Sequence, residues 1–304
     1  MKNKYLGLIF MSTTILQAQQ FPDIKAPVAE KQEHIREIHG DKVSDPYYWM
    51  IDYFKKGTNS AKVVDYLKAE NTYWTDMMKD TEPFREKLFL EMKNRIKEKD
   101  ESVPVFRKGY YYYTRTEAGK QYFKYCRKKG DLKAPEEILL DVDKLAEGHA
   151  YYAASGFSIS PDNMKMIYGV DDVSRRQYKL FLKDLSTGKT TDLGIINTTG
   201  SATWANDNKT IFYTAKNPET LLTEKIFRHS LGTDPSKDVL VYEEKDKSNY
   251  IGVGKSKNEK FIMISSGATT SSEIRYLDAD DPAGTFKIFQ PRMKDVIYDV
   301  TPLE

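Results

Sequence analysis

Three charged residues lie close together and are the strongest candidates for binding chemistry in the sequence. Arg115, Glu117 and Lys120 stand in one short stretch around Gly119. Exposed charges of both signs at this spacing could face a central cavity and meet the charged groups of a peptide, or they could only mark the turn of a hairpin. We predict these three as the binding residues and keep the hairpin as the alternative.

Hydroxyl and thiol groups offer no comparable catalytic site. The hydroxyl-rich stretch from Ser265 to Ser272 has no neighbouring base in the sequence, and a turn explains it better than a nucleophile does. Cys126 stands in an alternating, strand-like run, which favours a small apolar strand residue over a catalytic thiol. Because the chain has one cysteine, it can form no intramolecular disulfide.

The sequence also lacks two features of an α/β-hydrolase active site. The nucleophilic serine of such a site stands in Gly-x-Ser-x-Gly, because glycines allow the sharp strand-to-helix turn. No two glycines of this chain are four positions apart. The triad also needs a histidine after the Ser and the Asp, whereas the last histidine here, His229, lies inside a repeat. We therefore predict no catalytic residue in this chain.

Metal and cofactor sites are not predicted either. The four histidines are scattered, and no Cys/His group has the spacing of a zinc site. Asp278, Asp280 and Asp281 lack the loop glycine and the distal glutamate of a calcium-binding EF-hand, so a solvated turn fits them better. Gly252 and Gly254 alone are too short a motif for a nucleotide-binding loop.

Composition excludes further classes of protein. Charged residues make up 30% of the 304 residues and aromatic residues 12%, and the net charge is +2. The aromatic and apolar content is too high for a disordered chain. Lysine and glutamate are interleaved rather than gathered on a basic face, so we do not expect nucleic acid as a partner.

Residues 1–18 have the layout of a secretory signal peptide. Lys2 and Lys4 precede a mostly apolar run over residues 6–16, and cleavage is expected after Ala18. The run is too short to span a bilayer, and no other stretch approaches that length. We expect an exported, periplasmic protein without a membrane segment after cleavage; the alternative is a buried N-terminal strand or helix.

The elements that must position these groups begin with a helical segment. Between residues 60 and 96, apolar side chains recur at three- and four-residue steps, which predicts two helices. Thr81 is suited to the N-cap of the second helix and Pro83 to its first turn, so a tight corner is expected there. We assign residues 19–100 to an N-terminal helical extension.

After residue 100 the pattern changes to short strands in a repeating unit. The runs are rich in Tyr, Phe, Ile, Val and Thr and end at Gly, Asp, Asn or Pro. Three strand–turn–strand units align, at residues 157–168, 202–213 and 251–263, with a period of about 45 to 50 residues. Four short strands at this period predict a β-propeller, with a β-sandwich as the alternative.

Residues 101–304 supply about four blades of such a propeller. Residues 103–148 provide one blade, the aligned units provide three more, and residues 298–300 are expected to begin a fifth. The sequence therefore predicts a mainly β fold and an incomplete ring with an unpaired edge.

Several motifs resemble one family of serine peptidases. His39-Gly40-Asp41 and Asp45-Pro46-Tyr47-Tyr48-Trp49 are similar to the N-terminal segment of the prolyl oligopeptidase family. The stretches that resemble its oligopeptidase B (protease II) branch are Gly119-Lys120-Gln121-Tyr122, Leu145-Ala146-Glu147-Gly148-His149, Arg176-Gln177-Tyr178, Arg228-His229-Ser230-Leu231-Gly232-Thr233-Asp234-Pro235 and Leu277-Asp278-Ala279-Asp280-Asp281-Pro282. The resemblance runs from about Pro27 to Arg292 and concerns the N-terminal half of the family only.

This resemblance implies a fold of two domains, and it implies which of the two carries the catalytic residues. The family has a seven-bladed propeller over an α/β-hydrolase domain, on which the N-terminal helical extension packs. The catalytic Ser, Asp and His and the specificity for basic residues belong to the hydrolase half, which the resemblance places outside this chain.

The function implied is hydrolysis of short peptides after Arg or Lys, with this chain as the inactive propeller portion of the peptidase. The expected partners are short peptides that enter through the propeller channel and a separately encoded hydrolase half. The alternative is a non-catalytic propeller module that binds peptides or proteins.

Overall fold

The computed structural model describes residues 22–303, and the signal peptide expected at residues 1–18 lies outside them. The chain divides into two compact units, Met1–Lys97 and Glu98–Glu304. Over the residues described, no helix has both the length and the apolar character needed to cross a membrane.

The first unit combines a small hairpin with two main helices. Its elements are β1 (Ile35–Ile38), β2 (Asp41–Ser44), η1 (Tyr48–Ile51), α1 (Asp52–Lys55), α2 (Ser60–Met78), η2 (Lys79–Thr81) and α3 (Glu82–Lys93). β1 and β2 pair antiparallel around His39 and Gly40, which both have positive φ. Trp49 is buried, and its indole N–H donates to the carbonyl of Glu30 at 2.9 Å.

The helical corner is confirmed, but its cap differs from the prediction. α2 and α3 are separated by the short turn η2, and proline lies in the first turn of α3. Thr81 occupies the N-cap position without capping, because its backbone is already helical and its hydroxyl donates backwards to Met78 O at 2.6 Å. The hydroxyl therefore supplies a hydrogen bond to a carbonyl at the end of the preceding helix and accepts none from the first backbone N–H groups of α3.

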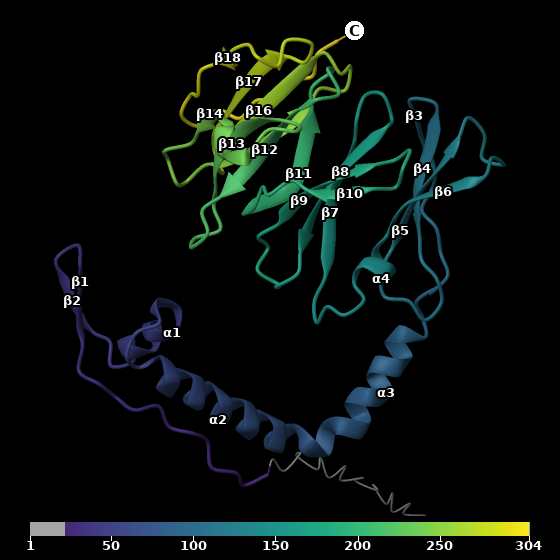
Figure 1. Ribbon diagram of the computed structural model, residues 1–304. Helices are drawn as coiled ribbons and strands as arrows, with labels where there is room; N and C mark the ends of the chain where they lie inside the picture. Colours follow the sequence, from purple (N-terminus) through teal and green to yellow (C-terminus); the bar gives the residue numbers. More distant parts are fainter. Residues whose placement is uncertain (1–21, 304) are drawn as a thin grey trace, which may run out of the picture. The chain divides into compact units, whose positions relative to one another are not determined.

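The second unit consists of four antiparallel sheets of four strands each, in chain order (Figure 1). Sheet 1 is β3 (Val105–Arg107), β4 (Tyr110–Arg115), β5 (Lys124–Lys129) and β6 (Glu136–Asp141). Sheet 2 is β7 (Ala153–Ile159), β8 (Lys165–Asp171), β9 (Lys179–Asp184) and β10 (Thr190–Asp192). Sheet 3 is β11 (Thr198–Trp204), β12 (Thr210–Lys216), β13 (Thr223–Ser230) and β14 (Val239–Glu243). Sheet 4 is β15 (Tyr250–Lys255), β16 (Phe261–Gly267), β17 (Ser272–Asp278) and β18 (Lys287–Gln290), and the connections hold α4 (Val142–Leu145) and η3 (Pro235–Lys237). The prediction of a mainly β fold built from propeller-type repeats is confirmed.

The three aligned sequence units form the same hairpin in sheets 2, 3 and 4. Each hairpin is closed by a backbone hydrogen bond of 2.9 Å, donated by Ser160, Ala205 or Ser256. The residues with left-handed backbone are Asn163, Asn208 and Glu259, with φ of 61°, 57° and 62°. In each turn the preceding Asp or Asn side chain accepts hydrogen bonds from the backbone beyond it. Hydrogen bonds within each turn therefore give the three hairpins the same conformation.

Each sheet packs face to face on the next one, through the alternation of side chains along its strands. On β8, Met166 and Tyr168 join the core between sheets 1 and 2, whereas Ile167 joins the core between sheets 2 and 3. On β12, Ile211 faces sheet 2 and Phe212 faces sheet 4. The middle sheets thus bury both faces, as strands with near-continuous apolar runs do.

Sheets 2 and 3 approach closely at three glycines. A Cβ atom on Gly156 or Gly169 would lie 2.0 or 2.3 Å from the backbone of Gly200, so no side chain fits at either position. Beside this contact, the Trp204 indole of sheet 3 donates to Ser158 O of sheet 2 at 3.0 Å.

The strand expected at residues 298–300 is not observed; residues 291–303 contain no strand. Tyr298 lies instead against sheet 4. Its hydroxyl accepts from Ile274 N at 2.8 Å and donates to Gln290 O at 2.5 Å, and its backbone N–H donates to Ser272 Oγ. The register of β17 and β18 shifts at Ile274, so the phenol fills the gap in their ladder.

Candidate functional site

A cavity of about 710 Å³ is lined mainly by residues of sheets 1 and 2, and the ends of β11 in sheet 3 and β15 in sheet 4 complete its wall. Its walls include Val105 of β3, Phe157 of β7, Trp204 of β11 and Lys255 of β15. Pockets that take small ligands have volumes in this range. The cavity is therefore the principal candidate for a binding site in the Glu98–Glu304 unit.

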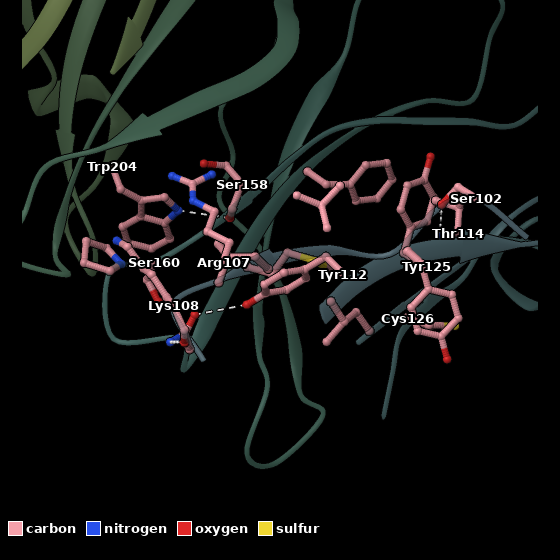
Figure 2. A pocket seen from close by; sticks show the side chains of 18 of the residues that line it. Ser102, Arg107, Lys108, Tyr112, Thr114, Tyr125, Cys126, Ser158, Ser160 and Trp204 are labelled. Atoms are coloured by element: carbon pink, nitrogen blue, oxygen red, sulfur yellow. Dashed lines mark hydrogen bonds between the residues drawn. The ribbon is translucent and has the colours of Figure 1, made fainter. Parts of the chain in front are cut away.

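One part of the cavity is aromatic. Tyr125 and Phe157 stack with ring centroids 3.5 Å apart, and Phe157 continues the stack to Tyr168 at 6.4 Å. Burial raises the pKa of Tyr125, so its phenol stays neutral at physiological pH. Figure 2 shows Ser102, Thr114 and Tyr125 on one side of the pocket and Trp204, Arg107 and Lys108 on the other.

That second side carries positive charge. Arg107, Lys108 and Lys255 line the cavity, and none of its described lining residues is an Asp or Glu. Glu259, just outside the wall, pairs with Lys108 and with Arg107, the latter at 3.1 Å. Burial opposes its ionisation, but the hydrogen bonds from Lys108 and Arg107 outweigh burial and lower the pKa of Glu259. The single carboxylate of Glu259 thus forms ion pairs with both Arg107 and Lys108.

The hairpins of the four sheets are tied together at this charged end. Asn163 Nδ2 donates to Lys108 O at 3.1 Å, which joins sheets 1 and 2. Asp162 N donates to Asn208 Oδ1 at 2.8 Å, which joins sheets 2 and 3. Asn206 Nδ2 donates to Glu259 O at 3.3 Å and joins sheets 3 and 4. Because Glu259 also pairs with sheet 1, these contacts form a closed circuit, called here the hairpin circuit.

The three predicted binding residues lie elsewhere, at and after the end of β4: Arg115 and Glu117 belong to an ion network, and Lys120 lies in the turn that follows. Arg115 binds Glu117 at 2.6 Å and Glu136 of β6 at 2.9 Å, and Lys124 pairs with Glu117 at 3.2 Å. Lys120 N–H donates to Glu117 O and closes the turn between β4 and β5. None of the three predicted residues lines the cavity, so their contact with a peptide stays a prediction.

This network depends on Glu136. Its two carboxylate oxygens share a bifurcated hydrogen bond from the Arg115 Nε–H, and the carboxylate also accepts from Arg115 Nη2 and from the Tyr113 hydroxyl, the latter at 2.5 Å. The hydrogen bonds from Arg115 hold the pKa of Glu136 at about 2, although burial acts in the opposite direction. The hydrogen bonds to Glu136 and Glu117 in turn raise the pKa of Arg115.

A buried His–Asp pair occurs in sheet 3, but it lacks a nucleophile. His229 Nδ1 lies 2.7 Å from Asp238 Oδ1, and the Tyr213 hydroxyl donates to Asp238 Oδ2 at 2.8 Å. His229 Nε2 is buried and has no hydrogen-bond partner among the residues described. No hydroxyl or thiol is therefore in place for this imidazole to activate, and the trio belongs to the core.

Cys126 is likewise a core residue. It lies on β5 with 1% of its surface exposed, and burial raises the pKa of its thiol to about 12. A protonated, buried thiol is inert, as expected for a small apolar strand residue. Within residues 22–303, no three His, Cys, Asp or Glu side chains gather in a group that could hold a metal ion.

Apart from Cys126, which also lines the cavity, none of the lining residues was singled out from the sequence, although the repeat contains a signal for two of them. Trp204 and Lys255 both stand at the end of a first strand, immediately before the polar turn of an aligned unit. Equivalent positions of a repeat meet at one end of the array, so the alignment itself marks the cavity wall.

Comparison with known proteins gives consistent matches. Residues 27–303 match the family model described as the N-terminal β-propeller domain of prolyl oligopeptidase. The chain is 37% identical to dipeptidyl aminopeptidase BI of Pseudoxanthomonas mexicana, over 97% of this chain and 42% of the relative. It is 31% identical to protease 2 of Moraxella lacunata, over 91% of this chain and 40% of the relative.

Solved structures agree with these relatives. Oligopeptidase B from Leishmania major superposes with a TM-score of 0.81 at 29% identity, and oligopeptidase B from Trypanosoma brucei with 0.79 at 26%. Each match covers 91% of this chain and 41% of the solved chain. The chain thus spans about two fifths of the length of the relatives it matches.

Proposed function

This chain belongs to the prolyl oligopeptidase family, and from that membership we propose that it forms the propeller portion of a serine-type oligopeptidase of oligopeptidase B type. In this role the propeller receives short peptides and passes them to an α/β-hydrolase domain. The observation that carries the proposal is the cavity, because residues of all four sheets contribute to its lining.

The chemistry is assigned to the hydrolase domain, not to this chain. The sequence contains no Gly-x-Ser-x-Gly, and the buried His229 has no hydroxyl partner among the described residues. The chain alone is therefore proposed to be inactive. Phe84, Phe89 and Met92 of α3 are each more than half exposed, which supports a helical extension that covers a hydrolase domain.

Cleavage after Arg or Lys is proposed from the likeness to the oligopeptidase B structures and to protease 2. We also propose export to the periplasm through the signal peptide at residues 1–18. Export is tested by fusing residues 1–18 to a reporter that matures only outside the cytoplasm. A reporter that stays in the cytoplasm contradicts it.

The activity is tested with the purified chain and a short peptide amide that contains Arg. The chain alone is expected to bind the peptide, to leave it intact and to resist labelling by a fluorophosphonate. Addition of the part of protease 2 of Moraxella lacunata that this chain does not match is expected to give cleavage after Arg or Lys. Labelling of one serine in the chain alone would overturn the assignment of catalysis, and failure to bind any peptide would overturn the role of the cavity.

A further inference from the structure

The charged end of the cavity has more cations than anions to neutralise them. Arg107 and Lys108 share the single carboxylate of Glu259. Lys255 Nζ, from sheet 4, donates to the neutral amide oxygen Oδ1 of Asn206. The other group of that amide, Nδ2, donates to Asp280 Oδ1 at 2.7 Å. Among the residues described, Lys255 therefore has no direct anionic partner.

We propose that this end of the cavity binds the C-terminal carboxylate of a short peptide, with Lys255 as its direct contact. The inference deepens the proposed function and rests on it, because it assumes that peptides enter the cavity. It goes further by stating which end of the peptide is held and by which residue.

The state of Lys255 supports this role. Burial lowers the pKa of its amine, and the positive charges of Lys108 and Arg107 act in the same direction. The negative charges of Glu259 and Asp280 oppose the shift without reversing it. A partly buried ammonium group that has lost water and gained only a neutral acceptor keeps much of its attraction for an anion. A carboxylate at this point would supply a charge-assisted hydrogen bond and restore the balance of charge.

The rest of the cavity suits the remainder of a peptide. No described lining residue carries a negative charge that would repel a carboxylate. Tyr125 and Phe157, together with Trp204 beside the cations, offer flat apolar surfaces for side chains of varied sequence. Every peptide has one C-terminus whatever its sequence, so an anchor for this group would accept many peptides while favouring short ones that fit the cavity.

The test compares three forms of one apolar tetrapeptide by isothermal titration calorimetry with the full chain. The forms are the free C-terminal acid, the C-terminal amide, and an amide with an internal glutamate. We expect the acid to bind at least about tenfold more tightly than the plain amide, as the loss of one hydrogen bond to a charged group predicts. The preference should weaken at high salt, because the contact is ionic.

Variants of one hairpin then identify the contact. Lys255→Met is expected to abolish the preference for the acid, and Lys255→Arg to retain it. Lys257→Met is the matched control, because Lys257 is exposed on the same hairpin and does not line the cavity. Circular dichroism of each variant shows whether the fold is intact.

Each outcome decides between the two proposals. Equal binding of acid and plain amide by the wild type overturns the carboxylate anchor but leaves peptide binding in the cavity standing. Tight binding of the glutamate-containing amide, equal to that of the acid, overturns the C-terminal assignment in favour of an acidic side chain. A preference that survives Lys255→Met removes Lys255 from the site. Absence of binding by all three peptides overturns the anchor and the proposed function together.

Discussion

The substitution Glu136→Gln should destabilise the Glu98–Glu304 unit measurably. It removes the negative charge that accepts hydrogen bonds from Arg115 and Tyr113, while the amide keeps the size of the side chain. Packing therefore changes little, and the loss reports the electrostatic contribution of Glu136. Arg115 and Glu136 are 23% and 27% exposed, so water screens part of this interaction.

The magnitude follows from the pKa of Glu136. The hydrogen bonds from Arg115 lower it from 4.5 to about 2, and one pKa unit corresponds to about 1.4 kcal/mol. Roughly 3.5 kcal/mol is thus the upper limit, and partial exposure reduces it to about 2 kcal/mol. A loss of this size lowers the Tm of a domain of this length by about 4–8 °C.

The dependence on pH provides a second, independent check. The folded-state pKa lies below the unfolded value, so the stabilisation is complete above about pH 4.5 and is lost as the pH falls towards about 2. Over this window wild-type Glu136 becomes protonated and resembles the variant. The difference in unfolding free energy between the two proteins should therefore shrink as the pH is lowered.

Urea denaturation at several pH values between 7 and 3 measures both effects. Glu147→Gln is the matched control, because Glu147 is an exposed glutamate of the same unit for which the described residues offer no ion pair. Equal stability of wild type and Glu136→Gln at pH 7 would refute the reasoning. So would a difference that stays constant down to pH 3.

Three further outcomes are expected from the packing. Gly169→Ala should lower the free energy of unfolding by about 1–3 kcal/mol, because its Cβ would lie 2.3 Å from the backbone of the next sheet. Gly254→Ala is the control: Gly254 has open space around it, so urea denaturation should show no loss of stability. Tyr213→Phe should cost about 1 kcal/mol, measured the same way, because buried Asp238 loses a hydrogen bond. Cys126 should resist a disulfide reagent in the folded protein and react at once in denaturant, since its thiol is buried with a pKa of about 12; rapid labelling of folded protein contradicts this.

Local features of the fold could be predicted from the sequence, whereas long-range contacts could not. The backbone of the turns at Asn163 and Asn208 is left-handed and hydrogen-bonded within each turn, so polar turn residues between apolar strands were sufficient evidence for them. The β1–β2 hairpin was not predicted, because its strands are mostly exposed and show no alternation of apolar and polar residues.

In the site, too, the contacts between residues far apart in the sequence could not be predicted. Arg115 was identified as a notable charge, but its main partner, Glu136, lies 21 residues away across a register shift between β5 and β6. The contact of Arg107 with Glu259 spans 152 residues. No periodicity or spacing connects such positions, because they meet only after the sheets have packed.

The face-to-face packing of the sheets has a consequence for how the unit opens. Sheets 2 and 3 have apolar cores on both faces, whereas β3 and β18, in sheets 1 and 4, contain no buried residue. Since each core joins only neighbours, loss of an outer sheet leaves the next core intact. Amide hydrogens of β8 and β12 should therefore exchange with solvent most slowly and those of β3 and β18 most rapidly, as the unit frays inwards from both sides.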